Sequence, residues 1–298
     1  MDGMKVAVVR NPASGRGSGG KTWPELKAAL RASVREFTVE ETTAPGSGAK
    51  QARRLAEQGW EIIVAAGGDG TVCDVMQGVL GTQSALGVLP MGTGNDFSRT
   101  LGIGTDQHLA VTTITKGRRE RIDVGRWTQG DRQGHFINVA GCGFDAAVAE
   151  RVNKGFRRLR GRNAYLAAIF QTLRKYKPTR LSLTVDGKPM EVKVMLCALA
   201  NARCYGGGLM IAPKADLQDG LLDLVVVGAL GKFEFLRNFR KVTKGTHLSH
   251  PKVSSFTFRV LELESHPPLP FLVDGELLPP GRVRVEVVPH ALDVMMPA

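Results

Sequence analysis

The chain has 298 residues, 43% of them hydrophobic, which is enough for two packed cores because a single core rarely exceeds roughly 250 residues. Its 40 Lys and Arg against 28 Asp and Glu leave a charge of +12, which favours polyanionic partners such as nucleotides, nucleic acid or anionic lipid headgroups. The four cysteines are widely spaced, which excludes the usual zinc-ligand spacing, and we interpret them as reduced core thiols.

The first residues, MDGMKVAVVRNP, have neither the basic start nor the apolar stretch of a signal peptide, so we expect a cytoplasmic protein. No uninterrupted apolar run reaches the roughly 18 residues that span a bilayer. Any membrane contact is therefore expected to be peripheral, at the inner face of the membrane.

Short β-branched runs alternate with helical segments from Lys5 to about Gly102. This alternation is typical of a doubly wound parallel sheet covered by helices on both faces. The predicted strands are 5–9, 37–41, 61–68 and 84–90, and the predicted helices are 23–33, 48–59, 71–80 and 95–103.

After about Asp123 most segments alternate apolar and polar residues, with turn signals at Asp186-Gly187 and Asp274-Gly275, which predicts mainly antiparallel strands. We therefore expect an α/β domain at 1–123 and an all-β domain at 124–298, whose last strand is free to return to the first domain. The predicted strands are 135–141, 180–201, 220–228, 253–265 and 270–290.

A basic segment interrupts the second half, because Arg151 to Lys177 contains nine Lys or Arg and no acidic residue. Its apolar residues fall on one face of a helix, which leaves two alternatives: a helix packed on its own sheet, or a membrane-facing amphipathic helix. These apolar residues are Tyr165, Leu166, Ile169, Phe170, Leu173 and Tyr176.

Three glycine-rich loops follow predicted parallel strands, at the edge where open α/β sheets bind ligands. In the first loop, Gly15 to Thr22 formally fits a P-loop, although it does not come straight off the strand and Pro24 crowds the helix start. The second loop, Gly67-Gly68-Asp69-Gly70-Thr71, lets backbone amides approach phosphate and offers a carboxylate for Mg²⁺; the alternative is a plain turn capped by Asp69.

The third loop, Leu89 to Phe97, provides close backbone approach at Gly92 and Gly94, and polar groups on Thr93, Asn95 and Asp96. Alone it predicts an N-cap turn, but beside the second loop it indicates a shared nucleotide pocket. Far downstream, Asp274 and Glu276 are expected on one face of a strand, where a paired carboxylate can act as a base; a solvated Asp-Gly hairpin is the alternative.

The segments NPASG (11–15), GGDGT (67–71), PMGTGNDFSR (90–99) and VDGE (273–276) together resemble the catalytic domain of diacylglycerol kinases, especially the stand-alone bacterial lipid kinases of the YegS type. The resemblance covers nearly the whole chain in the same order. It implies an ATP-binding α/β domain like that of NAD kinases and phosphofructokinases, and a C-terminal antiparallel β-sandwich that forms the other wall of the cleft.

The resemblance also implies roles for individual residues. Glu276 is the implied acceptor of the hydroxyl proton, and a family threonine matches Thr42 or Thr43, with spacing in favour of Thr43. The Asp219 carboxylate and the backbone carbonyls of Asp216 and Leu221 would hold a structural Mg²⁺, although the segment alone predicts a simple turn. The implied nucleotide contacts are Asn11, Pro12, Ala13, Ser14, Gly15, Gly68, Asp69, Gly70, Thr71, Val72, Cys73, Asp74 and Thr93.

We thus expect ATP and Mg²⁺ as cofactors, with Asp69 at the magnesium–nucleotide and Asp96 and Asp123 adding acidic character. The expected partners are a lipid substrate and an anionic membrane surface, and we expect no nucleic-acid partner. Whether the chain forms a homodimer is left open. A kinase of a soluble acceptor such as NAD and a basic nucleic-acid-binding module are the competing functions.

Overall fold

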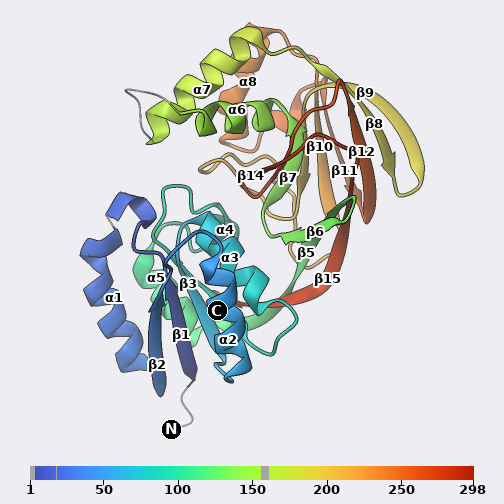
Figure 1. The fold of residues 1–298 in the computed structure, drawn as a ribbon. Helices are drawn as coiled ribbons and strands as arrows, with labels where there is room; N and C mark the ends of the chain where they lie inside the picture. The colour runs from blue at the N-terminus through green and yellow to red at the C-terminus, as the bar shows by residue number, and fades with distance from the viewer. Residues whose placement is uncertain (1–3, 18, 156–160) are drawn as a thin grey trace.

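The computed structural model describes residues 4–17, 19–155 and 161–298 (Figure 1). In the N-terminal half, four parallel strands lie in the order β2-β1-β3-β4. Helices α1 and α5 pack together, as do α2 and α3. The elements are β1 (Lys5–Arg10), α1 (Gly19–Ser33), β2 (Glu36–Glu41), α2 (Ser47–Glu57), β3 (Ile62–Gly67), α3 (Asp69–Val79), β4 (Ala85–Pro90), α4 (Asp96–Thr100) and α5 (Gln107–Lys116), with a short 3-10 helix at Ser14–Gly17.

The central strands of this sheet are covered on both faces. All residues of β3 and β4 are buried, which agrees with their nearly continuous apolar sequences. Helix α3 packs closely on α2 at Gly78, where a Cβ atom would come within 2.4 Å of the Ala49 carbonyl oxygen. This contact sets the position of α3, whose N-terminus follows the second glycine-rich loop.

The C-terminal half is an antiparallel β-sandwich with three helices on one side (Figure 1). One apolar core lies between its strands, and a second lies between the sheet and the helices. The elements are β5 (Arg118–Gln129), β6 (Arg132–Phe136), β7 (Val139–Gly143), α6 (Phe144–Asn153), α7 (Gly161–Lys175), β8 (Thr179–Val185), β9 (Lys188–Ala200), β10 (Leu222–Gly228), α8 (Lys232–Val242), β11 (Val253–Phe258), β12 (Val260–His266), β13 (Phe271–Val273), β14 (Glu276–Leu278) and β15 (Val283–Met296), with a short 3-10 helix at His247–Ser249.

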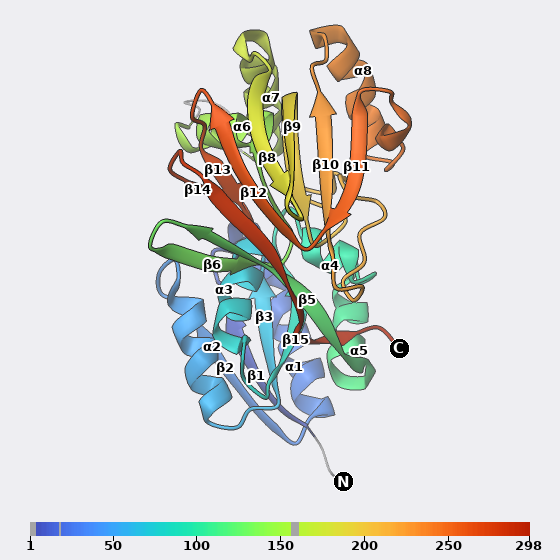
Figure 2. The same ribbon diagram turned by 90° about the vertical axis from the view of Figure 1, so that its right-hand side faces the viewer.

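The last strand joins the two halves. β15 pairs with β12 and β5, and it then lies parallel to β4 at Val294, opposite Leu86. Figure 2 shows this strand running from one half to the other, and the C-terminus lies beside α5. Its end is buried in the core of the N-terminal half. The predicted boundary after residue 123 falls inside β5 and stays a prediction.

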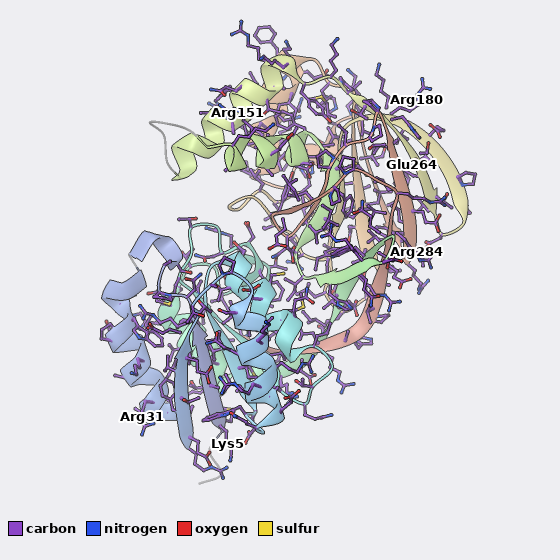
Figure 3. The ribbon with its side chains drawn as sticks, in the orientation of Figure 1. Lys5, Arg31, Arg151, Arg180, Glu264 and Arg284 are labelled. Carbon is purple, nitrogen blue, oxygen red and sulfur yellow. The ribbon has the colours of Figure 1, made fainter. Side chains whose placement is uncertain are left out.

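The predicted single helix from Arg151 to Lys177 is wrong. Helix α6 ends at Asn153, Gly155 has a φ of +76°, and α7 is a separate helix. Arg151 instead ties α6 to α7, because its Nε donates to the Gln171 side chain at 2.9 Å (Figure 3). Ile169 and Leu173 are buried against the sheet, so much of the apolar face packs on the chain itself. Arg157, Arg158 and Arg160, with the side chains of Tyr165 and Leu166, lie outside the described residues.

Other local predictions also need correction. The strand predicted at 135–141 is interrupted between β6 and β7, and the segment 253–265 forms two strands, β11 and β12. Strand β5 and helices α6 and α8 were not predicted, because their apolar residues are interleaved with charged ones or follow a strand directly. Within the described residues, no helix has the length and apolarity required to cross a membrane.

Candidate active site

The first two glycine-rich loops are bonded to each other at the carboxyl ends of β1 and β3. The Asn11 amide donates to the Ala66 carbonyl at 3.0 Å, and its side chain donates to the Thr71 hydroxyl at 3.3 Å. The Gly68 amide donates to the Ser14 hydroxyl, also at 3.3 Å. These strands are neighbours in the sheet, so the two loops form one surface.

The third loop comes even closer to the second. A Cβ atom built on Gly92 would lie 2.4 Å from the Cα of Gly68, which leaves no room for a side chain. Asn95, in a left-handed conformation with a φ of +53°, holds Gly92 through two hydrogen bonds of 2.9 Å. Thr93, which lies between Gly92 and Asn95 in the chain, is exposed. Glycine is required here by close packing between loops, and Asn95 shapes the third loop.

Asp69 connects the second loop to α4. Its Oδ1 accepts the amides of Asp96 at 2.6 Å and Phe97 at 3.2 Å, so it caps this short helix. The Oδ2 atom faces Gly94, where a Cβ would lie 2.6 Å away. Asp69 therefore caps α4 and not the turn into its own helix α3, where Gly68 is the N-cap residue and makes no side-chain cap bond.

Asp96 reaches across to the C-terminal half. Its buried carboxylate accepts the amides of Gly207 at 2.9 Å and Gly208 at 2.6 Å. Burial, and then the charge of Asp69, together raise the pKa of Asp96 to about 6, although the two amides oppose this rise. Both glycines have positive φ angles. They belong to the run Gly206-Gly207-Gly208, which was not among the predicted site residues. That run was the available signal for this contact.

The residues that follow Thr71 belong to α3 and differ in their surroundings. Val72 is buried in the core. Asp74 is partly exposed and accepts the Gly46 amide at 3.1 Å, which places it beside the N-terminus of α2. Thr43 is exposed just before this helix, and its amide donates to the Ser47 hydroxyl at 3.1 Å. The structure thus brings Asp74 and the segment after β2 together.

Asp274 and Glu276 do not share one face of a strand, contrary to the prediction. Asp274 and Gly275 form the two-residue turn between β13 and β14, with φ angles of +44° and +93°, and Glu276 starts β14. The Asp274 carboxylate accepts three amides, from Ile137 at 2.8 Å and from Asn138 and Val139 at 3.0 Å each. It therefore joins the hairpin to the break between β6 and β7.

The surroundings of these two carboxyl groups differ. Burial raises the pKa of Asp274 to about 6, the three amides oppose the rise, and the charge of Asp69 adds to it. Glu276 is exposed. Burial and then the charges of Asp274, Asp74 and Glu276 raise the pKa of the Cys73 thiol on α3. The hairpin of the second half therefore faces α3 of the first.

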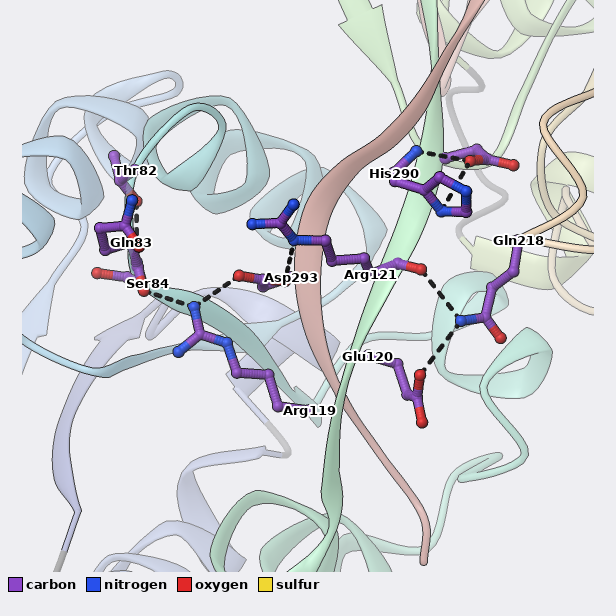
Figure 4. A network of polar contacts seen from close by, with 10 residues as sticks. Thr82, Gln83, Ser84, Arg119, Glu120, Arg121, Gln218, His290 and Asp293 are labelled. Carbon is purple, nitrogen blue, oxygen red and sulfur yellow. Dashed lines mark hydrogen bonds and ion pairs between the residues drawn. The ribbon is translucent and has the colours of Figure 1, made fainter.

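The segment from Asp216 to Leu221 is tied to β5 and β15 by a buried acid. Asp123 is fully buried, and its two oxygens accept the amides of Gly220 and His290 at 2.7 Å each. Gln218 adds bonds to the Arg121 carbonyl and the Glu120 side chain (Figure 4). Asp123 thus positions this segment.

Carboxyl groups in this segment repel one another. Burial raises the pKa of Asp219, and the charges of Asp216 and Asp123 raise it further, while the hydrogen bond from the Leu221 amide opposes this. A cation would relieve the repulsion. Within residues 4–17, 19–155 and 161–298, no group of three or more His, Cys, Asp or Glu side chains could hold a metal alone.

Comparison with known proteins gives matches over both halves. Residues 5–127 match the diacylglycerol kinase catalytic domain, and residues 138–296 match the YegS C-terminal NAD kinase beta sandwich-like domain. A diacylglycerol kinase of Mycobacterium tuberculosis (strain H37Rv) is 34% identical over 98% of this chain and 95% of its own length. A probable lipid kinase YegS-like of Chromohalobacter salexigens is 31% identical over 92% of this chain and 89% of its own.

The same fold occurs in a crystal structure of a diacylglycerol kinase from Bacillus anthracis. That structure superposes with a TM-score of 0.80 over 99% of this chain and 98% of its own, at 24% sequence identity. It supports the two-domain architecture of a parallel α/β half and an antiparallel β-sandwich.

Proposed function

The chain belongs to the diacylglycerol kinase family and is a lipid kinase, and from this premise we propose that it transfers the γ-phosphate of ATP to a hydroxyl of a diacylglycerol-like lipid. The observation that carries the proposal is the bonding of the three loops to one another and, through Asp96, to the C-terminal half that carries Glu276. The family assignment removes the support for the alternatives of a P-loop enzyme and a kinase of a soluble acceptor.

The nucleotide lies along the three loops. Backbone amides at the N-terminus of α3 can donate to phosphate oxygens, and the helix dipole adds positive potential there. The proposed contacts are Asn11 to Gly15, Thr43, Gly67 to Asp74, Gly92 and Thr93. Asn95 and Asp96 position these contacts without being among them. The Asn95 side chain is hydrogen-bonded to Gly92, and the Asp96 carboxylate accepts the amides of Gly207 and Gly208.

The donor set at Asp69 fits Mg²⁺. This ion prefers carboxylate oxygens, and in kinases it is usually bound by one or two carboxylates together with phosphates and waters. When bound, it neutralises charge that develops on the phosphates. Asp69 would contribute the carboxylate, since its Oδ1 is engaged by two amides and its Oδ2 is directed to the third loop.

Glu276 is the proposed general base. It takes the proton of the lipid hydroxyl as the oxygen forms a bond to the γ-phosphorus, the bond from that phosphorus to ADP breaks, and ADP leaves. An exposed carboxylate on a hairpin that faces α3 suits this task, because the lipid hydroxyl must reach it. Asp274 holds the hairpin in place through three amides and is the proposed positioning residue.

A second Mg²⁺ has a structural role in this proposal. Asp219 and the carbonyls of Asp216 and Leu221 would hold it, and the repulsion among the neighbouring carboxylates supports a cation there. Because the lipid substrate lies in a bilayer, the protein needs access to a membrane surface. We therefore propose that it is cytoplasmic and binds the inner face of the membrane peripherally.

The decisive experiment is transfer of labelled γ-phosphate from ATP with Mg²⁺ to lipids in mixed micelles, with wild type beside Glu276→Gln. Diacylglycerol, monoacylglycerol, phosphatidylglycerol, ceramide and a sphingoid base form the panel, and NAD is the soluble control. We expect label in one lipid class and a loss of about 100-fold or more in kcat for Glu276→Gln, as is typical for a general base. Transfer to NAD alone, or full activity of the variant, would contradict the proposal.

A further inference from the structure

Helix α8 has an outward face that combines aromatic and basic side chains. Phe233 is 90% exposed and Leu236 is 36% exposed, although both are large apolar residues. Arg237 and Arg240 are also exposed. In a helix, positions i, i+4 and i+7 lie on one face, so Phe233, Arg237 and Arg240 project from the same side. The opposite side, including Phe235 and Phe239, packs in the core.

Helix α7 repeats this pattern at its C-terminal end. Phe170 is 56% exposed, whereas its neighbours Ile169 and Leu173 are buried. Arg174 follows Phe170 at the same i+4 spacing, and Lys177 lies two residues beyond the end of α7; both are exposed. An exposed Phe followed by an exposed Arg one turn later therefore occurs on both helices.

The two faces adjoin. The Lys232 ammonium at the start of α8 donates to the Arg174 carbonyl at the end of α7, at 2.8 Å. Both views show these helices at the end of the molecule that lies away from the N-terminal half (Figures 1 and 2). Glu234 is the only acidic residue in the two helix sequences. It accepts the Lys252 ammonium at 2.9 Å and the Gly231 amide at 3.0 Å, so its charge is already compensated.

We propose that these outward faces form a docking face for a bilayer that contains anionic phospholipid. The docking face consists of Phe170, Arg174, Lys177, Phe233, Leu236, Arg237 and Arg240. The inference rests on the proposed function, because a lipid acceptor is supplied from a bilayer. It restricts the membrane contact predicted for the segment 151–177 to residues 170–177 and adds the outward face of α8.

The chemistry of the docking face favours this occupant. Aromatic and aliphatic side chains enter the boundary between headgroups and acyl chains, while guanidinium and ammonium groups meet lipid phosphates. Anionic leaflets attract such cations within a Debye length. A second copy of the chain suits the surface less well, because a two-fold contact would place the cations of one copy against those of the other.

The test is co-sedimentation of the full chain with vesicles of phosphatidylcholine, with and without phosphatidylglycerol. We expect wild type to bind the anionic vesicles and to dissociate with salt. Binding should fall about tenfold or more in Phe170→Ser/Phe233→Ser, since the apolar area that enters the bilayer is lost. A similar fall is expected in Arg237→Glu/Arg240→Glu. The matched control, Lys188→Glu/Lys193→Glu on β9, makes the same change in net charge and should bind as wild type.

A micelle assay separates this inference from the proposed function. With a short-chain diacylglycerol dispersed in detergent, the docking variants should transfer phosphate at the wild-type rate. Equal vesicle binding by wild type and both docking variants would overturn the docking face, as would an equal loss in the β9 control. A changed sedimentation coefficient of the Phe variant with unchanged vesicle binding would identify a second copy as the occupant instead. Phosphate transfer to no lipid at all by wild type would contradict the proposed function, whatever the vesicles show.

Discussion

The backbone amide of Asp96 donates a hydrogen bond of 2.6 Å to the carboxylate of Asp69. The carboxylate of Asp96 accepts in turn the amides of Gly207 and Gly208 from the other half of the molecule. One series of hydrogen bonds therefore runs from the second glycine-rich loop through the third loop into the C-terminal half. A change at Asp69 can alter both the charge at the proposed nucleotide site and the contact between the halves.

Two substitutions of Asp69 separate these effects. Asp69→Asn keeps an oxygen that can accept the Asp96 amide but removes the charge, so we expect a nearly unchanged unfolding free energy and a kcat lower by about 100-fold or more. Asp69→Ala also removes the cap of α4 and should cost roughly 1–2 kcal/mol of unfolding free energy. Labelled phosphate transfer and urea unfolding measure both quantities. Wild-type kcat in Asp69→Asn would contradict a role at the magnesium–nucleotide.

Asp274→Asn should destabilise the protein. The Asp274 carboxylate uses both oxygens to accept three amides, and the NH₂ group of Asn would face one of these donors. An unsatisfied buried donor costs about 1–3 kcal/mol, which we expect to see as a lower urea midpoint. Glu276→Gln is the matched control, because this exposed side chain should leave the midpoint unchanged. Equal midpoints for the two variants would argue against the positioning role of Asp274.

Gly92→Ala should weaken ATP binding. The added Cβ would lie 2.4 Å from the Cα of Gly68, so one loop must move away from the other. We expect the KM for ATP to rise about tenfold or more, because misplacement by even 1 Å is costly at a reacting centre. Steady-state kinetics with varied ATP measure this effect. An unchanged KM would mean that the loops can separate without affecting the nucleotide.

Asp145→Asn should stabilise the protein at neutral and basic pH. The Asp145 side chain lies in α6, lines an apolar cavity of about 60 Å³, and has its Oδ2 without a hydrogen-bond partner among the described atoms. Burial raises the pKa of Asp145 from 3.8 to about 7. Because the pKa is higher in the folded state, the wild type loses stability as the pH rises through this range.

The gain from Asp145→Asn should therefore depend on pH. Above pH 8 it should reach at most roughly 4 kcal/mol, at about 1.4 kcal/mol for each pH unit by which folding raises the pKa, and it should shrink as the pH falls toward 4. Urea unfolding of both proteins between pH 5 and pH 8 gives the difference directly, and other titrating groups cancel in it. A difference that is constant with pH would show that the Asp145 carboxyl does not titrate in this way.

Several elements could be predicted because their signals are local. The strands β1, β3 and β4 are β-branched or apolar runs, and the Asp-Gly pairs at 186–187 and 274–275 do form the expected tight turns. The first residues of α2 and α3 follow glycines closely. Helix α8 was missed although Phe235, Phe239 and Val242 recur at helical spacing and pack against the core, because Phe233 and Leu236 add exposed apolar residues outside that face.

The order of the glycine-rich loops and the residue types in them were enough to indicate a phosphate site, because such sites need close backbone approach and free amides at helix N-termini. The family resemblance was likewise readable from four short segments. These conclusions depend on residues near one another in the chain.

The tertiary structure alone decided which polar groups meet. Asp96 is bound by Gly207 and Gly208, and Asp274 is bound by the amides after β6, through contacts between distant segments. The separation of Asp274 from Glu276 also depends on the turn between β13 and β14 rather than on strand periodicity. A buried carboxylate needs donors to offset its lost hydration, and only the folded chain determines which amides lie within reach.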